Sequence, residues 1–381
     1  MAVQLSDLRP VYVVGVGLHR YQRASDALYP ALGVTAIRAA LADAGMTWEQ
    51  VESAYVGTAL LGMAAGRPML RHLGAHGLPI THIENASATG SSAFRSACIE
   101  VASGLSDVAL AVGVDKPYTV ENAATHASER TTAEKAVAPF VHFAILMEEY
   151  AARHGSDASD FAYVAAKNLR NGALNPFAHR QRAQSVDEIL GSRNIAGALT
   201  SLQCCPVSEG AAAVLVASRD GIDRLGLGLN RAIRVAASAS RSERWDAGAN
   251  ADAELTALTT SIALAEAGIM PQELDIIELH DAFTVEEPLY LEAIGLVADG
   301  QALPAIKEGA FDIDGECAVS PSGGLLAMGH PIGPTGVGQI VEIATQLRGE
   351  AGARQHKGAR LGLAHMVGLG AVCYVHVLAQ D

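Results

Sequence analysis

The chain of 381 residues is long enough for two core-forming units, because single domains usually run to roughly 100–200 residues. Half of its residues are hydrophobic and only 18% are charged, which is typical of a globular protein and not of a disordered chain. The 27 basic residues are outnumbered by 41 acidic residues, for a formal net charge of −14. Such a charge repels a polyphosphate backbone, so we expect no nucleic-acid partner.

The five cysteines, Cys98, Cys204, Cys205, Cys317 and Cys373, show neither paired metal-ligand spacing nor the density of a disulfide scaffold. No other residues have metal-ligand spacing, so no metal site is expected. The N-terminal residues lack a charged segment followed by an apolar stretch, and no apolar run approaches the roughly 20 residues that span a bilayer. We therefore expect a cytoplasmic protein with reduced thiols and no contact with a membrane.

Strand-like apolar runs alternate with helix-length segments, which is the pattern of an α/β protein with buried strands. In the first part of the chain, the pattern predicts strands at 11–16, 53–57 and 108–114 and helices at 31–44 and 88–102. In the last part, it predicts strands at 232–237, 274–279 and 370–378 and helices at 253–267 and 335–347.

The repeated order of elements indicates an internal duplication. The segment TGSSAFRSACIEVASG from Thr89 is similar to TGVGQIVEIATQLRG from Thr335, and EGAAAVLVAS from Glu209 is similar to GLGAVCYVHVL from Gly368. Each half therefore has a glycine-led helix and a closing strand.

One segment, 116–202, has no counterpart in the second half and is rich in His, Arg and Asn. We interpret it as an inserted loop domain that faces the substrate. The expected organisation is a first half at 1–115 and 203–228, the insertion at 116–202, and a second half at 229–381.

Ser87 lies in HIENASATGSSAFRSACIE, where an apolar strand leads through a turn of small residues into an amphipathic helix. Backbone N–H groups at the start of a helix stabilise negative charge, so a nucleophile or an oxyanion is favoured there. The alternative is that Ser87 only caps the helix, as serine often does.

Two histidines occupy comparable turns. His280 follows a strand-like run in ELHDAFTVEEPLYLEAIGL, and sites gather at strand ends in open α/β sheets, although a structural histidine is the alternative. His330 lies between Gly329 and Pro331 in PSGGLLAMGHPIGPTGVGQI, a loop whose glycines indicate close backbone approach and which is poorly suited to core packing. The glycines that begin at Gly368 lead into the last strand, where tight packing alone would explain them.

Taken together in this order and spacing, these segments resemble the thiolase superfamily, most closely its sterol carrier protein-type and bacterial acetyl-CoA acetyltransferase-like branch. The resemblance covers nearly the whole chain and includes NASATGSSA, KNLRNGALNPFA, LTSLQCCPVSEGAAAV, HDAF, GHPIGPTG and the terminal GLG strand. It implies an α/β fold of five αβαβα layers built from two duplicated βαβαβαββ halves. The active site would lie where the two glycine-led helices meet.

The resemblance also implies roles for individual residues. In relatives, a cysteine at the position of Ser87 takes the acyl group, and a histidine matching His330 activates it and helps to bind the thioester oxygen. His280 would line the same oxyanion site, and backbone N–H groups of Ser87 and Gly368 would hold the oxyanion of the acyl-enzyme. Coenzyme A would enter as part of a substrate or product thioester, with no bound cofactor.

The sequence departs from the family pattern at three positions. Ser87 replaces the nucleophilic cysteine, and an alcohol is far harder to ionise than a thiol. Met366 stands where the family has an acid/base cysteine, and Ala282 stands where the HDCF motif of the sterol carrier-type branch has an alternative one. Ser87 is a natural or an engineered replacement, and an engineered one leaves the second missing cysteine unexplained.

Three functions remain open from the sequence. The first is an acyl-CoA C-acyltransferase that makes or breaks a C–C bond next to a CoA thioester. The second is a thiolase-like retro-aldolase acting on a β-hydroxyacyl-CoA such as a sterol side chain, which needs only a base and an oxyanion site. The third is a non-catalytic acyl-CoA-binding subunit. The two retained histidines favour the first.

The resemblance implies a homodimer or higher homo-oligomer, and a possible small partner protein with an OB fold and a zinc ribbon. Arg180, Arg182 and Arg193 are candidates for holding a CoA phosphate, without a choice between them. His142 matches a region that borders the acyl pocket in relatives, but a packed core histidine is the favoured interpretation.

Overall fold

The computed structural model describes residues 4–117, 139–245, 251–368 and 372–381 of the chain. The strands of the first half are β1 (Val11–Gln22), β2 (Ser53–Gly57), β3 (Ile80–Ile83), β4 (Val108–Asp115) and β7 (Glu209–Ser218). Those of the second half are β8 (Ile233–Ser242), β9 (Ile276–Glu278), β10 (Ala318–Val319), β11 (Leu361–Gly368) and β12 (Val372–Ala379).

The two sets of strands repeat one topology. Their orders are β3-β2-β4-β7-β1 and β10-β9-β11-β12-β8, joined at β1 and β8 into one ten-stranded sheet. In each set the first three strands are parallel and the next two join antiparallel. The junction consists of only two residue pairs, Tyr12 with Arg234 and Val13 with Ile233. The internal duplication predicted from the sequence is therefore confirmed in the strand order.

Helices complete the layers. They are α1 (Tyr29–Ala44), α2 (Gly66–Arg71), α3 (Thr89–Ala102), α6 (Pro139–His154), α7 (Ala162–Ala173), α8 (Val186–Leu190), α9 (Arg219–Leu225), α10 (Ala251–Ala267), α11 (Glu286–Ile294), α12 (Ala302–Glu308), α13 (Gly324–Ala327) and α14 (Ile332–Leu347).

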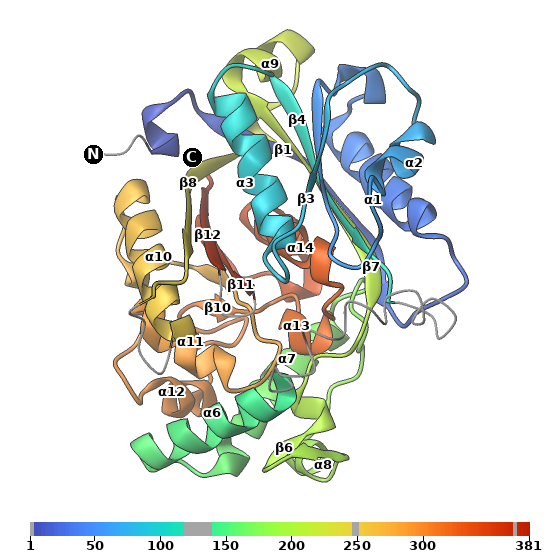
Figure 1. The fold of residues 1–381 in the computed structure, drawn as a ribbon. Coiled ribbons are helices and arrows are strands. Elements are labelled where there is room, and N and C mark those ends of the chain that lie inside the picture. The colour runs from blue at the N-terminus through green and yellow to red at the C-terminus, as the bar shows by residue number, and fades with distance from the viewer. Residues whose placement is uncertain (1–3, 118–138, 246–250, 369–371) are drawn as a thin grey trace.

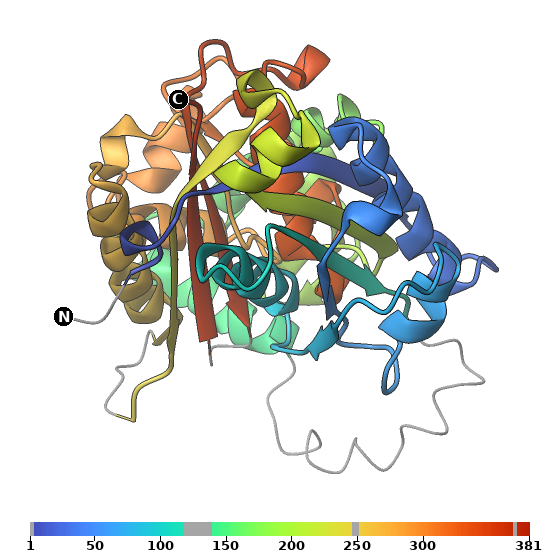
Figure 2. The same ribbon diagram turned by 90° about the horizontal axis from the view of Figure 1, so that it is seen from above.

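The order of the layers follows from which strands each helix covers. Helix α1 packs on β1 and β7, α10 packs on β8 and β12, and α14 touches strands of both sets while lying against α3 (Figures 1 and 2). Strands β4 and β7 are buried along their whole length, as expected of strands covered on both faces. The five-layer αβαβα sandwich expected for this chain is thus the observed architecture.

The predicted elements are confirmed with small shifts at their ends. Strand β2 has the predicted bounds, whereas β1 continues beyond 16 to Gln22 because it pairs with β7 along its length, although its later residues are no longer continuously apolar. The last strand, predicted at 370–378, is β12; residues 370 and 371 lie outside the described residues.

The predicted insertion lies between the end of β4 and the start of β7. Its described part carries α6, α7, α8 and a small hairpin of β5 (Asn194–Ala196) and β6 (Leu199–Thr200), at the bottom of Figure 1. The domain boundaries at 115/116, 202/203 and 228/229 stay a prediction.

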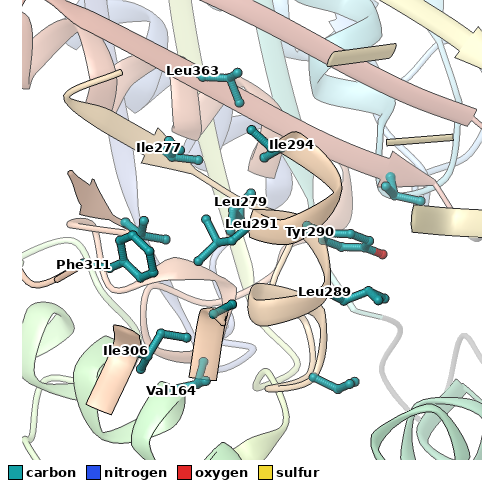
Figure 3. Packing of buried hydrophobic residues seen from close by; sticks show 14 of the residues in the cluster. Val164, Ile277, Leu279, Leu289, Tyr290, Leu291, Ile294, Ile306, Phe311 and Leu363 are labelled. Atoms are coloured by element: carbon teal, nitrogen blue, oxygen red, sulfur yellow. The ribbon is translucent and has the colours of Figure 1, made fainter. Parts of the chain in front are cut away.

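A cluster of buried apolar side chains fixes helix α11 to the second sheet. Leu291 and Ile294 of α11 face Ile277 of β9 and Leu363 of β11 (Figure 3), and all four are buried. Burying each such side chain contributes about 1.5–3 kcal/mol. Helix α11 (Glu286–Ile294) is therefore packed against β9 and β11 of the second sheet.

Glycines set how closely α3 and α14 approach each other. A Cβ atom on Gly90 would lie 2.6 Å from the Gly333 carbonyl oxygen and 2.8 Å from the Val337 nitrogen, and one on Gly336 would collide with Ser91. These neighbours are largely backbone atoms, which cannot move aside as a flexible side chain does. The two helices thus meet backbone to backbone at the ends that carry Ser87 and His330.

We predict that Gly90→Ala destabilises the protein by about 2 kcal/mol. Alanine gains at most about 1 kcal/mol in helix propensity, but forcing a methyl group into a packed interface costs about 1–3 kcal/mol or more when backbone must shift. The measurement is the midpoint of denaturant unfolding. Gly62→Ala, where a Cβ would meet nothing within 4 Å, is the control and should leave the midpoint unchanged. Equal midpoints for both variants would contradict this packing.

Candidate active site

Ser87 lies in the turn between β3 and α3, and the turn is tightly held. Ala86 has a φ of 48°, a left-handed conformation that costs a non-glycine residue about 1–2 kcal/mol. The Thr89 hydroxyl donates to the Ala86 carbonyl at 2.7 Å and accepts the Asn85 N–H at 2.8 Å. The N-cap of α3 is Ala88, with no side-chain cap. The interpretation of Ser87 as a helix cap is therefore wrong.

The Ser87 hydroxyl forms a hydrogen bond with His330 instead. Its Oγ lies 3.1 Å from His330 Nε2, and His330 Nδ1 lies 2.9 Å from Thr335 Oγ1. The single hydroxyl proton of Thr335 goes to the Pro331 carbonyl at 2.7 Å, so Thr335 accepts the Nδ1–H of the imidazole. The tautomer that follows leaves the Nε2 lone pair free to take the proton of Ser87.

The loop that carries His330 is fixed from the first half by Asp115. This buried carboxylate, at the end of β4, accepts the N–H of Gly333 at 2.6 Å and the hydroxyl of Thr58 at 2.6 Å, together with the N–H groups of Ala59 and Leu60. Burial raises the pKa of Asp115, while these four donors pull it back. Asp115 acts as a clamp that aligns the start of α14 with the strand ends of the first half.

The environment keeps His330 uncharged. Burial, followed by the neighbouring His280, lowers the pKa of His330 to about 3. The ring stands edge-on to His280, with centroids 5.5 Å apart and planes at 85°. A neutral imidazole beside a hydroxyl has the protonation state that a general base requires.

His280 is oriented by Glu286 and keeps one nitrogen unpaired. Its Nδ1 lies 2.7 Å from Glu286 Oε1, and Glu286 is itself held by the Phe283 N–H at 2.8 Å and the Tyr290 hydroxyl at 3.2 Å. Nε2 of His280 is buried and has no hydrogen-bond partner among the described residues. A buried nitrogen without a partner costs about 1–3 kcal/mol, so its orientation is best explained by a ligand oxygen.

Gly368 and Met366, the other positions named from the family resemblance, lie on β11 near the turn of Ser87. A Cβ atom on Gly368 would lie 2.6 Å from the Asn85 carbonyl oxygen and 3.4 Å from Ala88 Cβ, so its backbone lies against the turn of Ser87. Met366 is buried on β11 opposite Tyr374 of β12, whose hydroxyl donates to Ser92. The structure therefore brings Ser87, His280, His330 and Gly368 together at the ends of α3 and α14.

Two secondary interpretations change in the structure. Arg180 donates to the backbone carbonyls of Cys204 and Leu326, each at 2.9 Å, and of Ser201, so it ties the insertion to the rest of the protein and is occupied. His142 is exposed on α6, so its interpretation as a packed core histidine is wrong. Its neighbour Phe143 stacks on Phe283 of the HDAF turn, with centroids 4.5 Å apart.

All five cysteines are free in the structure. One of them lies closer to the site than the sequence indicated: the Cys205 N–H donates to the Ala282 carbonyl at 2.7 Å. Burial, reinforced by Glu286, raises the pKa of the Cys205 thiol to about 12. A thiol so far from ionisation is a poor nucleophile.

One group of metal-ligand side chains lies among the described residues. It consists of His154, Glu292 and Asp299, whose ligand-type atoms lie within 4.8 Å of one another, and His154 forms an ion pair with Asp299 at 3.6 Å. Asp299 is mostly exposed, and the group is separate from Ser87 and its partners. Over the described ranges, no helix is both long and apolar enough to cross a bilayer.

Three orienting residues were missed in the sequence: Asp115, Thr335 and Glu286. Asp115 follows a buried strand, which is a usual signal for a site residue, but lies at the edge of the predicted insertion. Thr335 and Glu286 lie five and six residues after the histidines that they hold, and each belongs to the helix that follows its histidine. Each of the two lies in the first turn of that helix, and that position is the signal that would have identified them.

Comparison with known proteins assigns the family. Residues 17–186 match the thiolase N-terminal domain and residues 239–380 match a thiolase C-terminal domain-like family. Sterol carrier protein 2 from Gallus gallus is 35% identical over 98% of this chain and 72% of its own length. The benzoylsuccinyl-CoA thiolase subunit BbsB from Thauera aromatica is 35% identical over 95% of both chains.

The fold agrees with this assignment. The Ltp2-ChsH2(DUF35) aldolase superimposes with a TM-score of 0.83 over 98% of both chains, at 21% identity. The chain belongs to the thiolase family.

We predict that the His330 imidazole stays neutral from pH 8 down to pH 5. Its pKa is lowered to about 3, so the base form persists well below the pH at which an ordinary histidine gains a proton. The measurement is the pH dependence of its ring signals by NMR, assigned by their loss in His330→Gln. A titration midpoint near 6.5 would contradict the closed environment described here.

Proposed function

We propose that the protein is an acyl-CoA C-acyltransferase that makes or breaks a C–C bond next to a CoA thioester, with Ser87 as the acyl acceptor. The observation that carries this proposal is the hydrogen bond from Ser87 Oγ to His330 Nε2, with the tautomer fixed by Thr335. A hydroxyl paired with a neutral imidazole is the arrangement of an activated oxygen nucleophile.

In the cleavage direction, Ser87 Oγ attacks the 3-oxo carbonyl of a 3-oxoacyl-CoA while its proton passes to His330 Nε2. The C–C bond then breaks, leaving the acyl group on Ser87 and the enolate of acetyl-CoA, which takes the proton from His330. The thiol of a second CoA gives its proton to His330, attacks the acyl ester and releases acyl-CoA. The proton then returns to Ser87. His330 serves both proton transfers, because the side chains of Met366 and Ala282 have no group that can accept or donate a proton.

The oxyanion formed in each step needs donors. His280, with Nδ1 held by Glu286 and Nε2 unpaired among the described residues, is the proposed contact to the thioester oxygen. The backbone N–H groups of Ser87 and Gly368 are the proposed donors. Removing one such donor typically costs about 10²–10³ in rate. His280 as the contact to the thioester oxygen and His330 as base thus divide the work between two neighbouring rings.

Serine makes this chemistry slow. An alcohol holds its proton more tightly than a thiol does, and a base whose pKa is lowered to about 3 takes it reluctantly. We therefore expect Ser87→Cys to form an acyl adduct faster than the serine protein, by about tenfold or more, because a thiol ionises more readily.

The test is intact-protein mass after incubation with a panel of acyl-CoA and 3-oxoacyl-CoA thioesters, with CoA release followed in parallel. The proposal predicts an acyl adduct on the serine protein and on Ser87→Cys, and none on Ser87→Ala. The matched control is Ser91→Ala, which removes a buried hydroxyl without a hydrogen-bond partner among the described residues and should keep the adduct. Absence of any adduct on the serine protein contradicts covalent transfer.

Retro-aldol cleavage of a β-hydroxyacyl-CoA is the second candidate. It is favoured by the lack of a thiol at positions 87, 282 and 366, since that reaction needs a base and an oxyanion site but no covalent nucleophile. If Ser87→Ala still cleaves a β-hydroxyacyl-CoA, the aldolase takes the place of the acyltransferase. Binding of thioesters without any turnover would instead indicate the acyl-CoA-binding subunit.

The proposal also includes residues for a CoA phosphate, a homodimer, a partner protein and a location in the cell. Arg182, exposed and paired with Glu188 at 2.6 Å, and Arg193, also exposed, are left as candidates for a CoA phosphate. Strand β3 is a partly exposed sheet edge that ends beside the turn of Ser87, and it offers a place for a second copy in a homodimer. A small OB-fold and zinc-ribbon partner and a cytoplasmic location also stay predictions.

A further inference from the structure

An open pocket of about 390 Å³ lies beside the loop of His330, and it is lined by basic and polar side chains. Arg20, Gln22 and Arg23 come from the end of β1 and the residue after it, Ser25 follows, and His179 comes from the insertion. Arg20, Gln22 and Arg23 can donate to a ligand without a change of protonation, whereas the single hydroxyl proton of Ser25 goes to Glu209.

The two guanidinium groups of the pocket are not neutralised. Arg20 donates to the Ala178 carbonyl at 3.3 Å and to Gln181 Oε1 at 3.2 Å, which are uncharged acceptors. Arg23 is exposed, and no carboxylate of the described residues forms an ion pair with it or with Arg20. Two positive charges therefore face the pocket without a counterion from the described part of the chain.

The carboxylate of Glu209, which contacts two of the pocket residues, is already paired. Glu209 accepts from Gln22 at 2.9 Å and from Ser25, and it forms an ion pair with Lys116 at 2.7 Å. Lys116 balances its charge, so Glu209 does not offset the two arginines. The pocket keeps a positive field, which contributes, after burial and together with Arg180, to lowering the pKa of His179 to about 4.

Residues that line the pocket contact the loop that carries His330. The His179 N–H donates to the Met328 carbonyl at 3.0 Å, and a Cβ on Gly329 would lie 3.2 Å from His179 Cβ. On the other side, the hydroxyl of Tyr21, between Arg20 and Gln22 in sequence, donates to the Pro334 carbonyl at 3.1 Å. A group bound in the pocket is therefore adjacent to the loop that positions His330.

We propose that this pocket binds an anionic group of the thioester substrate, either a phosphate of CoA or a carboxylate on the acyl group. The inference rests on the proposed function only in naming a thioester as the carrier of the anion. Guanidinium groups suit both oxyanions, because their planar N–H donors match two oxygens at once.

The test compares Arg23→Gln with Arg38→Gln, an exposed arginine of α1 outside the pocket that loses the same charge. Binding is measured by calorimetry in the Ser87→Ala background, so that no acyl group is transferred. The probes are pantetheine, 3′-dephospho-CoA, CoA, butyryl-CoA and succinyl-CoA. Loss of one charge-assisted contact is expected to weaken binding of the anionic probe about tenfold in Arg23→Gln and not in Arg38→Gln.

The probes separate the two sources of the anion. A loss for CoA but not for pantetheine assigns the pocket to phosphate, whereas a loss for succinyl-CoA beyond that for butyryl-CoA assigns it to an acyl carboxylate. Equal affinities in both variants for every probe overturn the inference. If no CoA compound binds at all, the proposed function has failed separately. Inorganic phosphate and succinate then decide: binding that Arg23→Gln weakens supports the pocket, and no binding overturns it.

Discussion

The close approach of α3 and α14 is the constraint on which the rest of the site depends. Gly90 and Gly336 leave no room for a side chain between the helices, and the turn before one helix then faces the loop before the other. Ser87 and His330 come from equivalent places in the two halves, each ahead of a glycine-led helix. The duplicated fold therefore creates a hydroxyl–imidazole pair from residues 243 positions apart.

Around that contact, the structure assigns different environments to two similar rings. His330 is held by Thr335 and kept neutral by burial, which lowers its pKa, whereas His280 is held by the carboxylate of Glu286 and keeps a buried nitrogen unpaired among the described residues. Neighbouring groups whose environments differ in this way are suited to opposite roles in proton transfer. Asp115 links the two halves by accepting the Gly333 N–H. The position of His330 is therefore coupled to the end of β4 in the first half.

The sequence predicted the strands well because those of a covered sheet are continuous apolar runs, as in β4 and β7. It also selected Ser87, His280 and His330, through the turns in which they lie and the family resemblance, and the structure brings these three side chains together, while their catalytic roles stay a prediction. It could not identify Asp115 as a clamp, because its partner Gly333 is 218 residues away in the chain. Nor could it show that Arg180 is occupied by backbone carbonyls or that His142 is exposed, since both depend on how the insertion packs.

A crystal structure of the serine protein after exposure to a reactive acyl-CoA tests covalent transfer to Ser87 most directly. Covalent transfer predicts electron density continuous from Ser87 Oγ to the acyl carbon, with the acyl oxygen within hydrogen-bonding distance of the backbone N–H groups of Ser87 and Gly368. An intact thioester bound with its carbonyl away from both histidines, or a Ser87 hydroxyl turned from His330 in the bound state, would contradict it.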